Sequence, residues 1–529
     1  MCWCRRAVAL LAISAVMLLP DLSAATPTRS TPGVSASEIV VAGSPADLAA
    51  AVASTNGFGL DLYRALRSQA TSENLFISPL SVAMALTMTA EGAAGETASQ
   101  MAAVLRFPAS TTERASIDSV HRGHAALIGQ LRVAAGAAPP EVRAQIEQVR
   151  AQRAELEARG RSMAEAQNWT EFDRLAEAAE RQNAMLAGLL TAFDRFELEI
   201  ASSLWVDRSF DVLLPYVMKI DLLYGGGLTN LDIRGDTEGS RKRINDWVAK
   251  RTSGRIAEMI PKGALRPEIA LVITNAIYFR GEWADPFDAE RTREEPFTRA
   301  DGTATPAKLM HDPARASIGY AAFTGRGEHF ETPRRVPVDP AARPATYPDD
   351  GGFSMIELPY KGGALSMVVI APRSASGLGA IESMLGPESL KSWLGRLDRR
   401  TVDVAIPRFA LAWNDELSGA LRGLGMSRAF VDTAVDGGAE FPGISSGDDP
   451  SKRLFIGSVL HKSWVEVTEE GTEAAAATAV SAAPGSAVEP PRDMPFTPVF
   501  RADRPFLFII RDTASGAILF MGRMANPTA

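Results

Sequence analysis

Histidine and cysteine, two residue types that often carry out enzyme chemistry or bind metals, are rare in this 529-residue chain. Its histidines and cysteines are His121, His124, His311, His329, His461, Cys2 and Cys4. His121 and His124 lie one helical step apart, but no acidic partner or third ligand accompanies them, so we expect both on the surface. The chain has no HExxH zinc motif, no GxxxxGK[ST] phosphate loop and no CxxC pair. We therefore expect no catalytic residues, no metal site and no cofactor.

A different chemistry is suggested by a run of small residues, Glu469-Glu470-Gly471-Thr472-Glu473-Ala474-Ala475-Ala476-Ala477-Thr478-Ala479-Val480. In a strand, successive side chains face opposite sides of the sheet. One face of this run would carry Thr472, Ala474, Ala476, Thr478, Val480 and Ala482, and the other Glu473, Ala475, Ala477, Ala479, Ser481 and Ala483. The first set is small and mostly apolar, so it could slide over a packed core, with Gly471 as a pivot. The same composition is also typical of an Ala-rich helix or a low-complexity linker.

Composition and the N-terminus indicate a globular protein outside the cytoplasm. Hydrophobic residues make up 46% and charged residues 22%, and the net charge of −8 argues against a nucleic-acid partner. Residues 1–25 predict a signal peptide, with Arg5 and Arg6 before a short apolar run and Ser23-Ala24-Ala25 as the cleavage site. A membrane anchor is the alternative, but the run is too short to span comfortably. We expect a secreted or periplasmic protein whose cysteines leave with the signal, followed by a flexible linker over 26–46.

The elements that must position the small-residue run alternate between helices and strands. Helices are predicted over 48–66, from Ser78-Pro79 as cap and first helical residue, from Gly95, and over 245–260. Strands are predicted over 200–206, 271–279 and 402–409, over 455–467 just before the run, and at 506–510 and 517–520. A hairpin is predicted from 356–360 and 365–370.

Two segments interrupt this pattern. Residues 141–193 carry heptad spacing in two pieces and predict an antiparallel helical hairpin, either a solvated surface element or a partner-binding arm. Residues 324–352 are rich in Pro, Arg and Asp and predict a long surface loop.

Three blocks in order carry a resemblance to a known family: NAIYFRGEW (275–283), HKSWVEVTEEGTEAAAATAV (461–480) and FRADRPFLFIIRD (500–512). Together with NLFISPLSVAMAL near the N-terminus, the chain resembles the serpins, of bacterial type, with the helical hairpin as an addition. The resemblance covers about residues 47–527, and it implies one α+β serpin domain over 47–529. That fold has a large mixed β-sheet, two smaller sheets, about nine helices and an exposed reactive-centre loop, here 469–504.

The resemblance also implies roles for particular residues. The loop hinge would be Glu469, Glu470, Gly471, Thr472, Glu473, Ala474, Ala475, Ala476, Ala477 and Thr478. The polar cluster beneath the main sheet, called the shutter, would be Ser78, Ser81, Asn275 and His461, and Trp283 would lie at the top of the sheet. An ordinary core position remains the alternative for His461 and for Trp283.

The implied activity is inhibition of a serine protease, or of a cysteine protease as second option, by a monomer without nucleic-acid or membrane partners. The family spacing places the scissile bond at Gly485-Ser486, and Ala483, Val488 and Arg492 are other candidates for the bait residue. Small residues would suit elastase-like or subtilisin-like proteases, and Arg492 a trypsin-like one. The alternative function is a non-inhibitory carrier, chaperone or scaffold. Proline in the hinge would favour that alternative, because proline cannot join a central strand, and here the first proline is Pro484.

Overall fold

The structure, a computed structural model, describes residues 43–68, 74–109, 113–135, isolated positions from 145 to 182, and 196–225, 227–337, 351–432, 437–445, 453–472 and 493–527. The predicted signal peptide and most of the predicted linker lie outside these residues. The described helices are α1 (Pro45–Arg67), α2 (Pro79–Ala90), α3 (Gly95–Val104), α4 (Glu113–Ala134), α7 (Leu214–Tyr224), α8 (Thr237–Arg251), α9 (Leu378–Met384), α10 (Pro387–Leu394) and α11 (Ser418–Gly423). None of these helices is long and apolar enough to cross a membrane.

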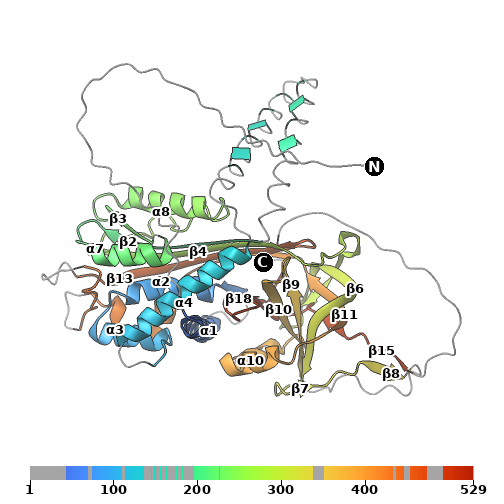
Figure 1. The fold of residues 1–529 in the computed structure, drawn as a ribbon. Helices are drawn as coiled ribbons and strands as arrows, with labels where there is room; N and C mark the ends of the chain where they lie inside the picture. Colours follow the sequence, from blue (N-terminus) through green and yellow to red (C-terminus); the bar gives the residue numbers. More distant parts are fainter. Residues whose placement is uncertain are drawn as a thin grey trace, which may run out of the picture. The chain divides into compact units, whose positions relative to one another are not determined.

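A six-stranded mixed sheet holds the segment that leads to the small-residue run (Figure 1). Its order is β12 (Phe409–Glu416), β13 (Ile456–Val467), β4 (Leu271–Glu282), β2 (Phe196–Asp207) and β3 (Leu228–Leu231), with the short β14 (Gly471–Thr472) paired to β4. Every residue of β4 from Leu271 to Phe279 is buried, as expected for a central strand covered on both faces.

A second, ten-stranded sheet shares a hydrophobic core with the six-stranded sheet. Its path is β1 (Leu75–Ile77), β18 (Ile518–Met524), β17 (Phe506–Asp512), β10 (Leu365–Pro372), β9 (Phe353–Pro359), β6 (Ala304–Phe323), β11 (Asp398–Pro407) and β16 (Val499–Arg501), with β5 (Arg293–Thr298) and β7 (His329–Phe330) paired to β6. A two-stranded sheet joins β8 (Arg335–Pro337) to β15 (Asp493–Pro495). The predicted α+β class, with mixed sheets and about nine helices, is confirmed.

Helices cover both faces of the six-stranded sheet. The twelve residues of α2 are all buried, so the helix is apolar all round and belongs to the interior between the sheets. On the opposite face of the sheet, Ile244 and Val248 of α8 pack with Val272 and Ala276 of β4 in a separate core (Figure 1). Residues that alternate along β4 therefore face opposite sides of the sheet, with Ile273 and Ile277 in the cores on the α2 side.

Several element boundaries differ from the predictions. The first helix begins at Pro45, inside the predicted linker 26–46, because Ser44 and Asp47 form a capping box there. The helix predicted over 245–260 ends at Arg251, since the side-chain oxygen of Asn245 accepts hydrogen bonds from the amides of Met259 and Ile260 and holds the returning chain.

The structure describes three predicted segments only in part: the helical hairpin 141–193, the surface loop 324–352 and the reactive-centre loop 469–504. Every described position between 145 and 182 is helical. The antiparallel hairpin over 141–193 stays a prediction. The segment predicted as a surface loop over 324–352 contains β7 and β8, and 338–350 lies outside the described residues. The predicted exposed loop 469–504 is a strand at both ends, in β14, β15 and β16. Residues 473–492, which include all the scissile-bond candidates, are not described.

Candidate loop-insertion site

The central seam of the six-stranded sheet, between β4 and β13, is a parallel pair. It runs from Leu271 opposite Ile456 to Tyr278 opposite Trp464. The outer neighbours, β2 on one side and β12 on the other, pair antiparallel. A strand entering the seam antiparallel to both would replace one parallel ladder with two antiparallel ladders, which are slightly more stable per residue. The seam is thus the place where this sheet gains most from an additional strand.

The chain after β13 turns back into this seam. The amide of Thr468 donates to the carbonyl of Gly471 at 2.7 Å, and the amide of Gly471 donates to the carbonyl of Thr468 at 3.3 Å. The next residues form β14, antiparallel to β4, with Gly471 opposite Glu282 and Thr472 opposite Gly281. Gly471 and Thr472, near the start of the small-residue run, are therefore already paired with β4.

Gly471 makes this close pairing possible. Its φ is +140°, and a Cβ there would lie 2.3 Å from the carbonyl oxygen of Gly281 and 2.6 Å from the Cα of Glu282. Both atoms belong to the backbone of a central strand and cannot move aside cheaply. Only glycine fits this position, which gives a physical reason for the pivot predicted from the sequence.

Trp283 holds the turn in place. Its indole N–H donates to the carbonyl of Thr468 at 3.0 Å, and its amide donates to the carbonyl of Glu470 at 2.8 Å. The ring stacks on Tyr360, with centroids 4.7 Å apart and the planes 13° from parallel. The structure thus brings Trp283 directly against the hinge. Tyr360, which supports it from β9's end, carries no sequence signal beyond its place in the predicted 356–370 hairpin.

The two glutamates of the turn lie in different surroundings. Glu469 is buried, accepts a hydrogen bond from Thr292 Oγ1 at 2.7 Å, and lies 3.7 Å from the guanidinium of Arg408. Burial and the neighbouring Glu469 carboxylate raise the pKa of Glu470. The turn is therefore anchored by Glu469, while Glu470 contributes mainly through its backbone.

The structure brings the four predicted shutter residues together across the seam. His461 of β13 lies directly opposite Asn275 of β4, and its Nδ1 is 2.5 Å from Asn275 Oδ1. Ser81 Oγ donates to the same oxygen at 2.8 Å, and the amide of Ser78 donates to His461 Nε2 at 3.2 Å. Ser202 of β2, which sequence reasoning missed, accepts a hydrogen bond from Asn275 Nδ2 at 2.7 Å. Its only signal was its place in a predicted strand.

The network fixes the protonation state of His461. Because Nε2 accepts from a backbone amide, the proton of the neutral ring is on Nδ1 and points to Asn275. Burial lowers the pKa of His461 to about 3, so the ring is neutral at physiological pH. The bond between His461 and Asn275 crosses the seam, so any strand that enters the seam must break it.

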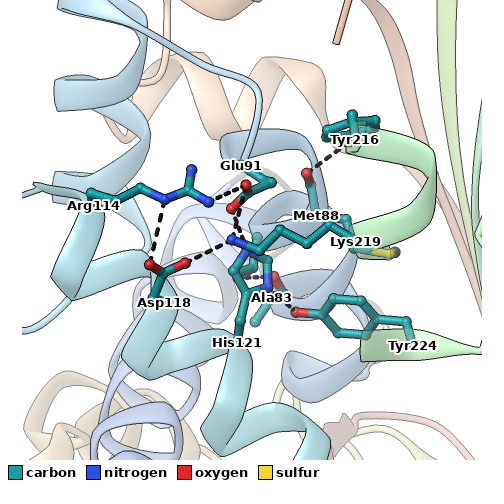
Figure 2. Close-up of polar contacts among 10 residues, drawn as sticks. Ala83, Met88, Glu91, Arg114, Asp118, His121, Tyr216, Lys219 and Tyr224 are labelled. Atoms are coloured by element: carbon teal, nitrogen blue, oxygen red, sulfur yellow. Dashed lines mark hydrogen bonds and ion pairs between the residues drawn. The ribbon is translucent and has the colours of Figure 1, made fainter. Parts of the chain in front are cut away.

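The prediction that His121 and His124 lie on the surface is wrong. Both rings are buried, and His121 lies 3.1 Å from a carboxylate oxygen of Glu91 and 2.7 Å from the hydroxyl of Tyr224 (Figure 2). His124 Nε2 lies 3.0 Å from Thr55 Oγ1. The acidic partner was missed because Glu91 follows α2, thirty residues before His121.

Glu91 is the centre of this charged cluster, which ties α2, α4 and α7 together. Lys219 of α7 lies 3.0 Å from the Glu91 carboxylate and 2.7 Å from Asp118 of α4, and Arg114 of α4 binds Glu91 at 2.5 Å (Figure 2). The hydrogen bonds from His121, Arg114 and Lys219 outweigh burial and lower the pKa of Glu91 to about 2. The cluster lies away from the hinge, and its arrangement is that of a structural clamp.

One GxSxG string, Gly443-Ile444-Ser445-Ser446-Gly447, has the spacing of a hydrolase nucleophile elbow. Such an elbow requires a sharp turn from a strand into a helix. Ser445 is buried and pairs in an isolated bridge with Val212. Residues 437–445, the described side of this string, contain no strand that leads into it. The string does not have the setting of a nucleophile.

Comparison with known proteins agrees with this geometry. The family model of the serpins, serine protease inhibitors, matches residues 53–147 and 152–527. Antithrombin-III of Mus musculus is 30% identical over 89% of this chain and 80% of its own length, and Serpin B6 of Pongo abelii is 31% identical over 90% and 99%. The crystal structure of uncleaved ovalbumin shares the fold, with a TM-score of 0.60 and 22% identity over 90% of this chain and all of that one. The crystal structure of human thyroxine-binding globulin also shares it, with a TM-score of 0.64 and 20% identity over 92% of this chain and all of that one. The chain belongs to the serpin family.

Proposed function

We propose that this serpin inhibits a serine protease as a suicide substrate, by inserting its cleaved reactive loop into the seam between β4 and β13. The observation that carries the proposal is β14, in which the loop already begins the inserted strand in the correct direction. Membership of the family supports protease inhibition in general. The geometry of the seam supports the insertion step in this particular chain.

The length of β4 matches the length of the small-residue run. β14 is antiparallel to β4, so each step forward along the loop corresponds to one step back along β4. Continued in this register, Ala482 would lie opposite Leu271, where β4 begins. Pro484, which could not pair in a central strand, lies beyond that point. Twelve residues at about 3.3 Å each would span about 40 Å. That distance would carry a tethered protease along the whole seam.

The same register decides which loop side chains would meet the core. Phe279 and Ile277 of β4 face the large core beneath the sheet, and Ala276 faces the α8 side. Residues paired directly opposite share a face, so Ala474 and Ala476 would lie over Phe279 and Ile277. These small side chains would enter without displacing the core.

Thr478 would arrive opposite Asn275, at the middle of the shutter. Its hydroxyl offers one donor and two acceptor sites. When β4 and β13 part, Asn275 Oδ1 and His461 Nδ1 lose their shared hydrogen bond. Thr478 would lie between them and replace the lost partner, so insertion would leave neither Asn275 Oδ1 nor His461 Nδ1 without a hydrogen bond.

The chemistry of the trap belongs to the protease and to the strand exchange. The protease serine attacks the loop carbonyl and forms an acyl-enzyme ester, with release of the new amino terminus. Insertion then moves the ester-linked protease away before water can hydrolyse the bond. We place the scissile bond at Gly485-Ser486, three residues beyond Ala482, with Ala483, Val488 and Arg492 as alternatives. We further propose that the protein acts as a secreted or periplasmic monomer.

The second candidate is a carrier or other non-inhibitory role. Thyroxine-binding globulin shares the fold and, as its name says, binds thyroxine. A carrier would not require the small-residue alternation or the match between β4 and the proline-free run.

The two functions are separated by incubation with subtilisin-like, elastase-like and trypsin-like proteases. We expect an SDS-stable complex with at least one of them, a single released C-terminal fragment whose mass locates the cut, and a large rise in the melting temperature after cleavage. Cleavage without a complex and without a rise in melting temperature would refute inhibition and favour the carrier.

A further inference from the structure

A cavity of about 300 Å3 lies at the foot of the seam, at the opposite end from Trp283. Ile269, just before β4, and Ile456 with Gly457, at the start of β13, line it from the two sides of the seam. We call it the foot cavity. It lies where an inserted strand would end.

The foot cavity carries an excess of positive charge. Arg266, Arg422 and Glu268 line it and are exposed, so its charged lining consists of two guanidinium groups and one carboxylate. Within the described part of the chain, neither arginine has a carboxylate at ion-pair distance. The guanidinium of Arg422 lies 4.7 Å from the ring centre of Phe430, which holds it at the cavity. One positive charge is left for a ligand to neutralise.

Gly457 of β13 packs closely against Ile269 at the foot of the seam. The ladder between β4 and β13 is irregular between Ile456 and Ser458. A Cβ on Gly457 would lie 2.7 Å from the Cγ2 of Ile269. Residues from both sides of the seam therefore line the cavity, so strands that part there would leave it on the path of the inserted strand.

We propose that the foot cavity binds the C-terminal carboxylate that cleavage creates on the loop, with Arg266 and Arg422 as its ligands. The proposal rests on the insertion described above. In the register of β14, Ala482 would lie beside Leu271, where β4 begins. The three residues from Ala483 to Gly485 would continue past that point for up to about 10 Å, toward the turn at 266–269 that carries Arg266 and Glu268. In molecules that are cleaved as plain substrate, water hydrolyses the acyl-enzyme ester after Gly485: the protease serine regains its hydroxyl, a proton leaves to the solvent, and the loop ends in a carboxylate. That charge arrives between the two arginines, and charge-assisted hydrogen bonds to guanidinium groups hold it.

The test uses synthetic peptides of this chain and the intact full-length protein. The probes are residues 472–485 with a free carboxylate, the same peptide as its C-terminal amide, and residues 472–482 in both forms as a length control. All carry a fluorophore at the N-terminus, and binding is followed by anisotropy at low and high salt. We expect the 472–485 acid to bind roughly tenfold more tightly than its amide. The shorter pair should bind equally, because its terminus stops beside Leu271.

Substitutions at the rim give results of opposite sign. Arg266→Gln and Arg422→Gln should each reduce the preference for the acid, whereas Glu268→Gln should increase it by removing a like charge. Equal binding of acid and amide in the wild type, or the same acid preference in the 472–482 pair, would overturn the foot-cavity proposal alone. Failure of every peptide to bind would overturn the insertion itself, and the proposed function with it.

Discussion

Replacing Thr472 by arginine tests the insertion register most directly. Thr472 pairs with Gly281, and a Cβ on Gly281 would lie 2.8 Å from the Phe279 ring and 3.0 Å from Tyr360. An arginine inserted opposite Gly281 would put an unpaired guanidinium against these aromatic rings. An uncompensated buried charge costs about 3–5 kcal/mol. The intact protein can avoid this cost by leaving β14 unpaired, but the inserted state cannot.

The expected effect is a change in how the acyl-enzyme partitions. If about half of that cost, roughly 2 kcal/mol, is felt in the transition state for insertion, insertion slows about 30-fold. The moles of inhibitor consumed per mole of protease equal one plus the ratio of hydrolysis to insertion, so the excess over one rises by the same factor of about 30. The assay is titration of residual protease activity, together with SDS gels for the covalent complex. Thr472→Arg should behave as a plain substrate.

Glu473→Arg is the matched control. The register places residue 473 opposite Arg280, which is partly exposed on the other face of β4. The arginine at position 473 has the same size and charge as the one introduced at position 472. Its like charge directly opposite Arg280 should cost less than about 1 kcal/mol. This variant should keep a stoichiometry close to that of the wild type. If Thr472→Arg forms the complex as efficiently as Glu473→Arg does, the register and the insertion mechanism are wrong.

Three further predictions follow from other parts of the structure. Gly471→Ala should break the pairing of β14 with β4 and speed amide hydrogen exchange around Gly281, while exchange in β17 stays unchanged. Unchanged exchange in β4 would contradict the steric reasoning. Burial lowers the pKa of both His461 and His124 to about 3, so the stability that depends on their neutral rings is complete above pH 6.5 and is lost as the pH falls toward 3. At pH 5 each of these two histidines should lower the free energy of unfolding by about 2 kcal/mol relative to neutral pH. The urea midpoint should therefore fall less between pH 7.5 and pH 5 in His461→Asn than in the wild type. An identical dependence of the midpoint on pH in the two proteins would refute this account. Deleting 141–193 should leave complex formation intact and change, at most, target choice or localisation, whereas loss of soluble expression or of inhibition against every protease would show that the hairpin is required.

The sequence alone determined the family and most of the secondary structure. Strands such as β4 and β13 and the helix start at Ser78-Pro79 follow from local patterns, because β-branched runs, caps and turns act over a few residues. The alternation after Gly471 also belongs to the sequence, since a strand's period of two needs no tertiary information.

Only the tertiary structure decided which residues meet across the seam and how far the loop has entered it. The contact of Asn275 with His461, the stacking of Tyr360 on Trp283 and the register of β14 join residues far apart in the chain. The same is true of Glu91 and His121, whose contact turned two predicted surface histidines into buried ones. Local patterns carry no information about such pairs, because their geometry depends on how the sheets and helices pack together.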